Sequence, residues 1–379
     1  MAEGNWKAIA AEIAERIESG EFSPGSRLPS GDQLARDLGV NRNATHRAVE
    51  ELQRQGLVIR RQGSGTVVAE PVDKKGCRIA LLVDGYSAAH NFPSGDLLRG
   101  IQDRIGEESS LVMADSKHDT AQENRQLRRL ARETDGILFY ATALDRPTPA
   151  LQVLLDEGFP VVAMDRMPHG VELDGVFTDN YSVVRKVVRS LVDRGHTRIG
   201  FLGFHRPSYS SVRERFEGYR EEMVRSGLPY SDLVRWLPDD SGGASEMSKQ
   251  LVHDAILALR YGADPITALF CVEDGVGCAA VPACERLGIE LPNDLEVSTF
   301  IDWHPMTLRT PWNVRRIVQR KYDLGHAAAG LLLDRIASPR RPIETVRVDA
   351  DIIPADADLN RASASTTAFQ LGTKEGHQP

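Results

Sequence analysis

Polar side chains gather on one face of a helix that is predicted near the start of the chain. Over residues 41–55, the positions spaced to pack inward are Thr45, Ala48, Val49 and Leu52. The opposite face carries Arg42, Asn43, His46, Arg47 and Glu50. Guanidinium and amide groups of this kind reach phosphates and base edges in the major groove of DNA. The face therefore predicts DNA binding, whereas the alternative for a single basic face is a solvated helix surface.

A second set of polar and aromatic side chains follows predicted buried strands later in the chain. The strands are expected at residues 79–83, 137–140, 160–164, 199–203, 268–272 and 297–301. A parallel sheet binds ligands at the carboxyl ends of its strands. The residues at those ends are Asp84 to Tyr86, Asp165, Phe204, His205, Glu273, Asp274, Asp302 and Trp303. Their position alone makes them candidates for a ligand site.

Short helices and a hairpin must position the basic face. Helical spacing of apolar residues runs from Trp6 to Gly20, and a second short helix is expected between Ser30 and Gly39. Ser30 and Gln33 have the spacing of a capping box. Residues 57–61 and 66–68 read as two strands joined by a glycine-containing turn. The pattern predicts a winged helix-turn-helix over residues 1–70.

Composition and charge separate this segment from the rest of the chain. The 379 residues, of which 41% are hydrophobic, exceed one ordinary domain. Residues 1–75 hold 11 Lys/Arg and 11 Asp/Glu, so the remainder carries the net charge of −8. The polar stretch 71–77 is expected to be a linker. Strands that alternate with helices over residues 78–358 predict parallel sheets covered by helices, an α/β fold. Residues 359–379, rich in Ser, Thr, Ala and Gly, are expected to form a disordered tail.

Several other classes are disfavoured by the sequence. Cys77, Cys271, Cys278 and Cys284 show neither C-x-x-C spacing nor a nearby His, so free thiols are expected and no metal. No apolar run is long enough to cross a membrane, so we expect a cytoplasmic location without membrane contact. Two hydrolase signatures, G-x-S-x-G and H-E-x-x-H, do not occur. Few lysines lie in the large segment, which makes a lysine-bound cofactor a poor fit. We expect no cofactor and favour a binding module over an enzyme.

The first segment resembles the DNA-binding domain of the GntR family of bacterial regulators. The matching stretches are residues 24–30, PGSRLPS, 34–42, LARDLGVNR, 56–58, GLV, and 61–66, RQGSGT. The resemblance implies that Arg27 holds a phosphate, that Arg42 and its neighbours read bases, and that residues 63–65 approach the minor groove. The implied DNA-binding residues are Arg27, Ser30, Asn41, Arg42, Asn43, His46, Arg47, Gln62, Gly63, Ser64 and Gly65. The chain departs from the family at Gly31 and at Thr45-His46, so the operator cannot be copied from relatives.

The large segment resembles the effector domain of the LacI/GalR family, which is similar to periplasmic sugar-binding proteins. The matching stretches include residues 135–138, DGIL, 161–166, VVAMDR, 194–201, RGHTRIGF, 215–219, RFEGY, and 291–297, LPNDLEV. The resemblance implies two Rossmann-like subdomains, the first at about 78–178 and 303–336 and the second at about 179–302 and 337–358. Their crossovers would lie near Asp179, Asp302 and Ala337. A GntR head with this body resembles the arabinose-repressor type of architecture.

The same resemblance places the effector between the two subdomains. It implies contacts from Asp165, Arg215 and Glu273, while Tyr86, Phe92 or Trp303 could cover the apolar face of a sugar. The full set of expected effector residues is Asp84, Tyr86, Phe92, Asp165, Arg215, Glu273, Asp302 and Trp303. The alternative for Asp165 and Arg215 is an interdomain salt bridge. In the resembled family an acidic residue that holds the ligand is expected directly after the late strand. That position is Ile301 in this chain, with Asp302 next, which weakens a sugar assignment.

Together these features predict a homodimeric transcriptional repressor that binds a palindromic operator and senses a sugar-like metabolite. A constitutive DNA-binding protein whose second domain only dimerises, and an enzyme fused to a DNA-binding domain, stay open as alternatives.

Overall fold

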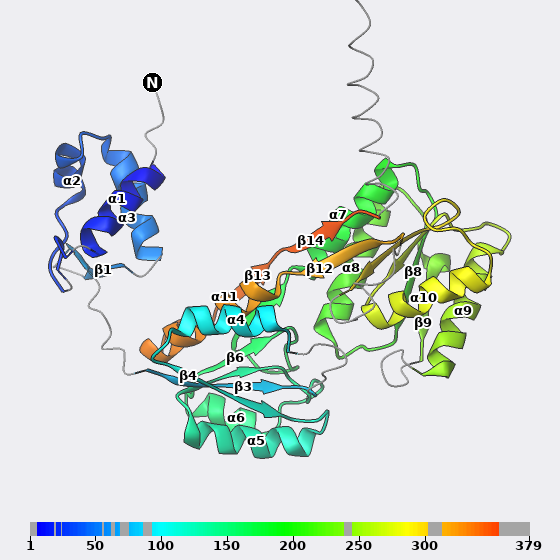
Figure 1. The fold of residues 1–379 in the computed structure, drawn as a ribbon, viewed down its shortest axis with the longest axis horizontal. Coiled ribbons are helices and arrows are strands. Elements are labelled where there is room, and N and C mark those ends of the chain that lie inside the picture. Colours follow the sequence, from blue (N-terminus) through cyan, green and yellow to red (C-terminus); the bar gives the residue numbers. More distant parts are fainter. Residues whose placement is uncertain are drawn as a thin grey trace, which may run out of the picture. The chain divides into compact units, whose positions relative to one another are not determined.

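The computed structural model describes residues 6–18, 20–23, 25–54, 57–61, 65–68, 76–85, 93–238, 245–301 and 313–355 (Figure 1). The chain divides into two compact units, Met1–Lys75 and Gly76–Pro379. Most of the expected linker and the whole expected tail lie outside the described residues.

The first unit is the expected winged helix-turn-helix. Its elements are α1 (Trp6–Glu18), α2 (Gly31–Asp37), α3 (Arg42–Arg54), β1 (Val58–Arg61) and β2 (Gly65–Val68). The two strands pair antiparallel, with Val58 opposite Val68 and Arg61 opposite Gly65. Ile13, Leu34, Ala48 and Leu52 pack into one apolar core that also includes Val68. This core fixes α3 with its polar face outward.

The second unit holds two lobes, each built on a six-stranded sheet. The first sheet has the order β13-β7-β6-β5-β3-β4, and all of its strands are parallel. Its strands are β3 (Arg78–Val83), β4 (Ser110–Asp115), β5 (Gly136–Phe139), β6 (Val161–Met164), β7 (Asp174–Thr178) and β13 (Thr345–Val348). Helices α4 (Gly95–Ile105) and α11 (Lys321–Ala337) cover one face, and α5 (Thr120–Glu133) and α6 (Pro149–Asp156) cover the other (Figure 1). Successive strand residues alternate between these two cores, as a pleated strand requires.

The second sheet has the order β14-β12-β11-β10-β8-β9. Its strands are β8 (Ile199–Phe204), β9 (Val234–Leu237), β10 (Ala268–Cys271), β11 (Glu296–Phe300), β12 (Arg315–Gln319) and β14 (Ala350–Ile353), of which β14 alone runs antiparallel to its neighbour. The accompanying helices are α7 (Asn180–Asp193), α8 (Ser210–Arg225), the 3-10 helix η1 (Ser231–Leu233), α9 (Glu246–Arg260) and α10 (Asp274–Arg286). One large core, which includes Phe201, Tyr219 and Phe270, unites them.

Strand pairing in the two sheets shows that two of the three predicted crossover positions between the lobes were wrong. The first lies between β7 and α7, where the sequence places it. The second follows Gln319 rather than Asp302, because β12 pairs with β11 in the second sheet. The third follows Val348 rather than Ala337, because β13 pairs with β7 in the first sheet and β14 returns to the second. The strand β12 was not predicted, because its RRIVQ sequence mixes charged, polar and apolar residues instead of forming an apolar run.

Candidate functional site

The outward face of α3 carries the polar residues that the sequence predicts there. Asn41, Arg42, Asn43, His46 and Arg47 are exposed, whereas Thr45, Ala48 and Leu52 are buried. Two of the exposed side chains are held by carboxylates. Nε of Arg42 lies 2.9 Å from Oδ1 of Asp32, and Nδ1 of His46 lies 3.3 Å from Oε1 of Glu50. The face is therefore exposed, and two of its side chains, Arg42 and His46, are held in place by carboxylates of the same unit.

Ser30 and Asn41, both expected at the DNA interface, cap helices. The Ser30 hydroxyl accepts a hydrogen bond from the backbone N–H of Gln33 at 3.2 Å, which caps α2. The Gln33 side chain donates to Asp37 and does not return to Ser30. Oδ1 of Asn41 accepts from the backbone N–H of Asn43 at 2.7 Å. These contacts fix the start of α2 and of α3, where backbone N–H groups lack helical partners.

The hairpin of β1 and β2, which forms the wing of this unit, is hydrogen-bonded to the segment that precedes α2. Arg27 forms an isolated antiparallel bridge with Val67, and the backbone N–H of Leu28 donates to the carbonyl of Thr66 at 2.9 Å. The Arg27 side chain is exposed. Gly65 begins β2. The other expected wing residues, Gln62, Gly63 and Ser64, lie outside the described residues.

In the second unit, the carboxyl ends of four neighbouring strands form a strand-end cluster, which consists of Asp84, Ser116, His118, Thr142, Asp165 and Arg166. The buried Asp84 carboxylate accepts a hydrogen bond from the Thr142 hydroxyl at 2.6 Å. Its other oxygen lies 3.2 Å from Nη2 of Arg166. Nδ1 of His118 also lies 3.2 Å from Asp84. The Asp84 carboxylate thus contacts side chains from the ends of the neighbouring strands β4, β5 and β6.

The backbone of Asp165 accounts for the position of Arg166. Asp165 has a φ of 65°, in the left-handed region that few residues other than glycine adopt. Aspartate tolerates this conformation better than most residues, and it turns the chain sharply at the end of β6. Nε of Arg166 then lies 3.2 Å from the Asp165 carboxylate. Burial opposes the charge of Arg166, but Asp165, Tyr209 and Asp84 together raise its pKa above the ordinary value. The guanidinium therefore stays charged.

Contacts from the second lobe continue this cluster. The Arg166 guanidinium lies 4.7 Å from the ring centroid of Tyr209, and Arg206 lies 5.3 Å from the same ring. Nη1 of Arg206 in turn lies 2.9 Å from Glu273, at the end of β10. Asp145 also accepts a hydrogen bond from Ser208, and the backbone N–H of Met167 donates to Ser210 at 3.4 Å. Charged and aromatic groups thus connect the two lobes.

A buried acid supports the cluster from the face that α5 covers. Glu123 is fully buried, and its Oε2 accepts the backbone N–H groups of Thr142 at 2.6 Å and Ala143 at 3.0 Å. Burial raises the pKa of Glu123, and the two backbone hydrogen bonds counteract that rise. Since the Thr142 hydroxyl donates to Asp84, Glu123 helps to position Thr142 within the strand-end cluster.

Arg215 lies within the second lobe. It is buried, and it donates to Oδ1 of Asn180 and to the carbonyl of Val272, both at 2.8 Å. Its guanidinium carbon lies 3.5 Å from the ring centroid of Phe300. These contacts place Arg215 beside the end of β10, where Glu273 follows Val272.

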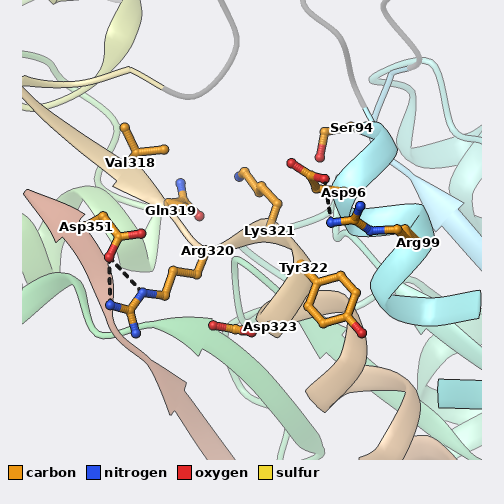
Figure 2. Close-up of a pocket in the computed structure, with 10 residues that line it drawn as sticks. All are labelled: Ser94, Asp96, Arg99, Val318, Gln319, Arg320, Lys321, Tyr322, Asp323 and Asp351. Atoms are coloured by element: carbon orange, nitrogen blue, oxygen red, sulfur yellow. Dashed lines mark hydrogen bonds and ion pairs between the residues drawn. The ribbon is translucent and has the colours of Figure 1, made fainter. Parts of the chain in front are cut away.

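A cavity of about 570 Å³ lies where the chain passes from the second lobe to the first. Figure 2 shows lining residues from α4, from β12 and the start of α11, and from β14. The lining residues are Ser94, Asp96, Arg99, Val318, Gln319, Arg320, Lys321, Tyr322, Asp323 and Asp351. Since α4 and α11 cover the first sheet while β12 and β14 belong to the second, a molecule held there would touch both lobes. The volume lies within the range of about 300–1,000 Å³ that is typical of small-ligand sites.

The charges around this cavity are mostly paired. Arg320 donates two hydrogen bonds to Oδ1 of Asp351, at 2.6 and 2.9 Å. Nη2 of Arg99 lies 3.2 Å from Asp96, and the Arg99 guanidinium lies 5.2 Å from the Tyr322 ring centroid. Paired acids and arginines beside hydroxyl and amide groups suit a small polar ligand better than an apolar one.

The structure brings together part of the expected effector set. Asp84 and Asp165 meet through Arg166, and Glu273 joins them through Arg206 and Tyr209. Tyr86, Phe92, Asp302 and Trp303 lie outside the described residues. Sequence reasoning missed Arg166, Arg206, Tyr209, Glu123 and the cavity lining. Arg166 and Arg206 were discoverable, because they come two and three residues, respectively, after predicted strand ends.

Several residues away from the strand-end cluster bear on other possible functions. His196 is structural, since Nδ1 lies 2.9 Å from the Thr267 hydroxyl and Nε2 lies 3.2 Å from Glu296. Burial raises the pKa values of the Cys271, Cys278 and Cys284 thiols, which are free. Within the described residues, no group of three acidic, His or Cys side chains could hold a metal. In the same part of the chain, every helix is too short or too polar to span a bilayer.

Two stretches of the chain match known protein families. Residues 5–68 match the bacterial regulatory proteins of the gntR family. Residues 188–355 match the periplasmic binding protein-like domain. These matches fall in the first unit and in the larger part of the second.

Individual proteins resemble the chain over most of its length. The arabinose metabolism transcriptional repressor of Geobacillus stearothermophilus is 23% identical, over 86% of this chain and 90% of that protein. The crystal structure of transcription regulator GntR from Chromobacterium violaceum is 26% identical, with a TM-score of 0.58 over 73% of this chain and 97% of that one. A LacI family transcriptional regulator from Enterococcus faecium, solved with bound ribose, is 24% identical, with a TM-score of 0.57 over 73% of this chain and 96% of that one.

Proposed function

We propose that this chain, in which a DNA-binding domain of the GntR family is joined to a periplasmic-binding-protein-like domain, is a ligand-responsive transcriptional repressor. The first domain would read an operator through the exposed face of α3, and the second would sense a small polar metabolite. The relatives named above are regulators rather than enzymes, which favours this function over a fused enzyme.

The observation that carries the sensing role is the cavity at the crossover between the lobes. A ligand in it would contact Asp96 on the first lobe and Asp351 on the second, so its binding would depend on the relative position of the lobes. A ligand shifts a conformational equilibrium only when it binds the two states unequally. A site with walls in both lobes meets this requirement when the lobes move as rigid bodies, whereas a site wholly within one rigid lobe does not.

A sugar-like metabolite is the ligand class that we propose. The charged pairs around the cavity, together with the Ser94 hydroxyl and the Gln319 amide, supply donors and acceptors for vicinal hydroxyl groups. The relative that was solved with ribose and the arabinose-repressor relative support this class. The strand-end cluster would respond to the same movement between the lobes, because Arg166 and Tyr209 come from different lobes.

A homodimer on a palindromic operator is the assembly that we propose. One α3 face reads only a few base pairs, and a two-fold pair of such domains doubles the contact and matches a palindromic site. Movement between the lobes would then alter the spacing of the two reading faces and so the affinity for the operator.

The function can be tested with the full chain. Thermal unfolding would be followed against pentoses, hexoses, sugar acids and polyols, since a ligand that binds the native state raises the melting temperature by mass action. An operator would be selected from random duplex DNA. We expect one compound class to raise the melting temperature saturably and to change operator affinity. Operator binding that no stabilising compound alters would instead favour the constitutive alternative.

A further inference from the structure

We propose that Asp32 is a specificity-determining positioning residue, which orients Arg42 for a two-hydrogen-bond contact with one guanine of the operator. This inference rests on the proposed DNA-binding function. It concerns a residue that sequence reasoning did not place at the interface, and it assigns an acidic group a favourable role beside DNA.

The geometry of the pair is set by two adjoining helices. Asp32 is the second residue of α2, and Arg42 is the first residue of α3. Hydrogen bonds fix the intervening turn, from the backbone N–H of Val40 to the carbonyl of Ala35 at 2.9 Å and from Asn43 to the Asn41 side chain at 2.7 Å. The two backbones are therefore held at a constant separation, and the 2.9 Å contact between Nε and Oδ1 does not depend on a flexible loop.

The atoms in contact decide which edge of Arg42 stays available. A guanidinium carries five N–H donors in a planar fork. Nε is the guanidinium nitrogen nearest to Asp32, so the edge formed by Nη1 and Nη2 lies farther from the carboxylate and is left for another partner. Among the described residues Arg42 has no other ion pair and no hydrogen bond, and its side chain is 77% exposed. Two N–H groups on one edge match O6 and N7 of guanine, the commonest specific arginine contact in the major groove.

The simple alternative is that the pair is a solvated surface salt bridge. Exposed pairs of this kind stabilise a free protein little. An acidic group near phosphates would then only repel DNA. An orienting role has the opposite consequence, because arginine loses rotamer freedom when it binds and a carboxylate that already holds it reduces that loss. The two views therefore predict opposite signs for removal of Asp32.

The same helix offers a matched control. Asp37 carries the same charge and is the last residue of α2, and it accepts a hydrogen bond from the Gln33 side chain at 2.9 Å instead of meeting Arg42. Replacement of Asp37 changes the charge of the unit by the same amount without releasing the guanidinium.

The test uses full-length protein and an operator selected from random duplex DNA, with fluorescence anisotropy at one fixed salt concentration. Asp32→Ala is expected to weaken operator binding about three- to tenfold, because Arg42 then loses more rotamer freedom on binding, and to relax the preference at one G·C pair. Asp37→Ala should leave affinity unchanged or raise it. Asp32→Glu, which keeps the carboxylate that pairs with Arg42, should restore most of the base preference. Asp32→Ala should add nothing to Arg42→Ala. Circular dichroism confirms that each variant is folded.

Three results would overturn the proposal. Unchanged or tighter binding by Asp32→Ala, with base preference intact, would make the pair a solvated salt bridge. Equal weakening by Asp32→Ala and Asp37→Ala would indicate a general effect on the domain. Failure of the wild-type chain to select any sequence would refute the proposed function itself, and the role of Asp32 would fall with it.

Discussion

Arg166 of the first lobe stacks on Tyr209 of the second, with its guanidinium carbon 4.7 Å from the centre of the ring. Tyr209 also packs against the apolar cores of both lobes. The same guanidinium contacts Asp84 and Asp165, so one side chain links the strand ends of the first sheet to the loop that follows β8 in the second. This contact helps to hold the two lobes in their observed arrangement.

Replacement of Tyr209 should loosen that arrangement. Cation–π contacts contribute about 0.5–2 kcal/mol, and Tyr209→Ala also removes apolar contacts with both lobes. We expect faster amide hydrogen exchange in residues 165–170 and 205–211 of Tyr209→Ala, measured by mass spectrometry. Tyr209→Phe keeps the ring and serves as the control. Equal exchange in Tyr209→Ala and wild type would show that the ring does not hold the lobes together.

Removal of Arg166 should be costly, because its partner Asp84 is buried. Breaking a buried ion pair from one side costs about 3–5 kcal/mol, since an uncompensated charge is left behind. Arg166→Ala should therefore lower the free energy of unfolding of the second unit by an amount of that order. Arg129→Ala, which breaks an exposed pair with Glu133, should cost less than about 1 kcal/mol. Chemical denaturation measures both, and similar losses would contradict the structural role of Arg166.

Glu123 should make stability depend on pH. Burial raises its pKa, so the folded chain holds this proton more tightly than the unfolded chain does. Its contribution is fully present below the ordinary glutamate pKa and is lost as the pH rises through the raised value. Glu123→Gln lacks this titration and keeps an acceptor for Thr142 and Ala143. The stability of the variant relative to wild type should therefore increase with pH across this range, measured by denaturation at several pH values. A difference that does not change with pH would refute the assignment.

The cavity should be required for the ligand response but not for DNA binding. Asp96 lines the cavity and its pair with Arg99 is exposed, so Asp96→Ala should leave the fold intact. We expect at least a tenfold loss of affinity for the stabilising ligand, measured by calorimetry, with operator affinity unchanged in its absence. Asp156→Ala is the matched control, because α6 covers the opposite face of the first sheet. Full ligand affinity in Asp96→Ala would move the site away from this cavity.

The sequence predicts the parts of the fold that depend on continuous apolar runs. The central strands of both sheets, such as β5 and β8, are buried on both faces, and parallel strands of this kind read as uninterrupted hydrophobic segments. The faces of α3 follow in the same way from its helical period. The strand β12 does not follow this rule, because Arg315 is buried against Glu296 and places a charge where an apolar residue is expected.

The residues of the candidate site could be predicted only in part, for a related reason. Positions at strand ends found Asp84, Asp165 and Glu273, because topology alone brings them to one edge of each sheet. The cavity lining at Arg320 and Asp351 was missed, since it depends on where the chain crosses between lobes and that position was misplaced. The pairing of Arg166 with Tyr209 joins residues far apart in the sequence, and no local pattern encodes such a contact.

The central claim is that ligand binding in the second unit controls DNA binding by the first. The most direct measurement is the affinity of the full-length protein for its selected operator, with and without a saturating amount of the compound that raises its melting temperature. The account predicts a change of tenfold or more that disappears in Asp96→Ala and persists in Asp156→Ala. Identical operator affinity in the presence and absence of bound compound would contradict it, since binding that does not distinguish two states cannot act as a signal.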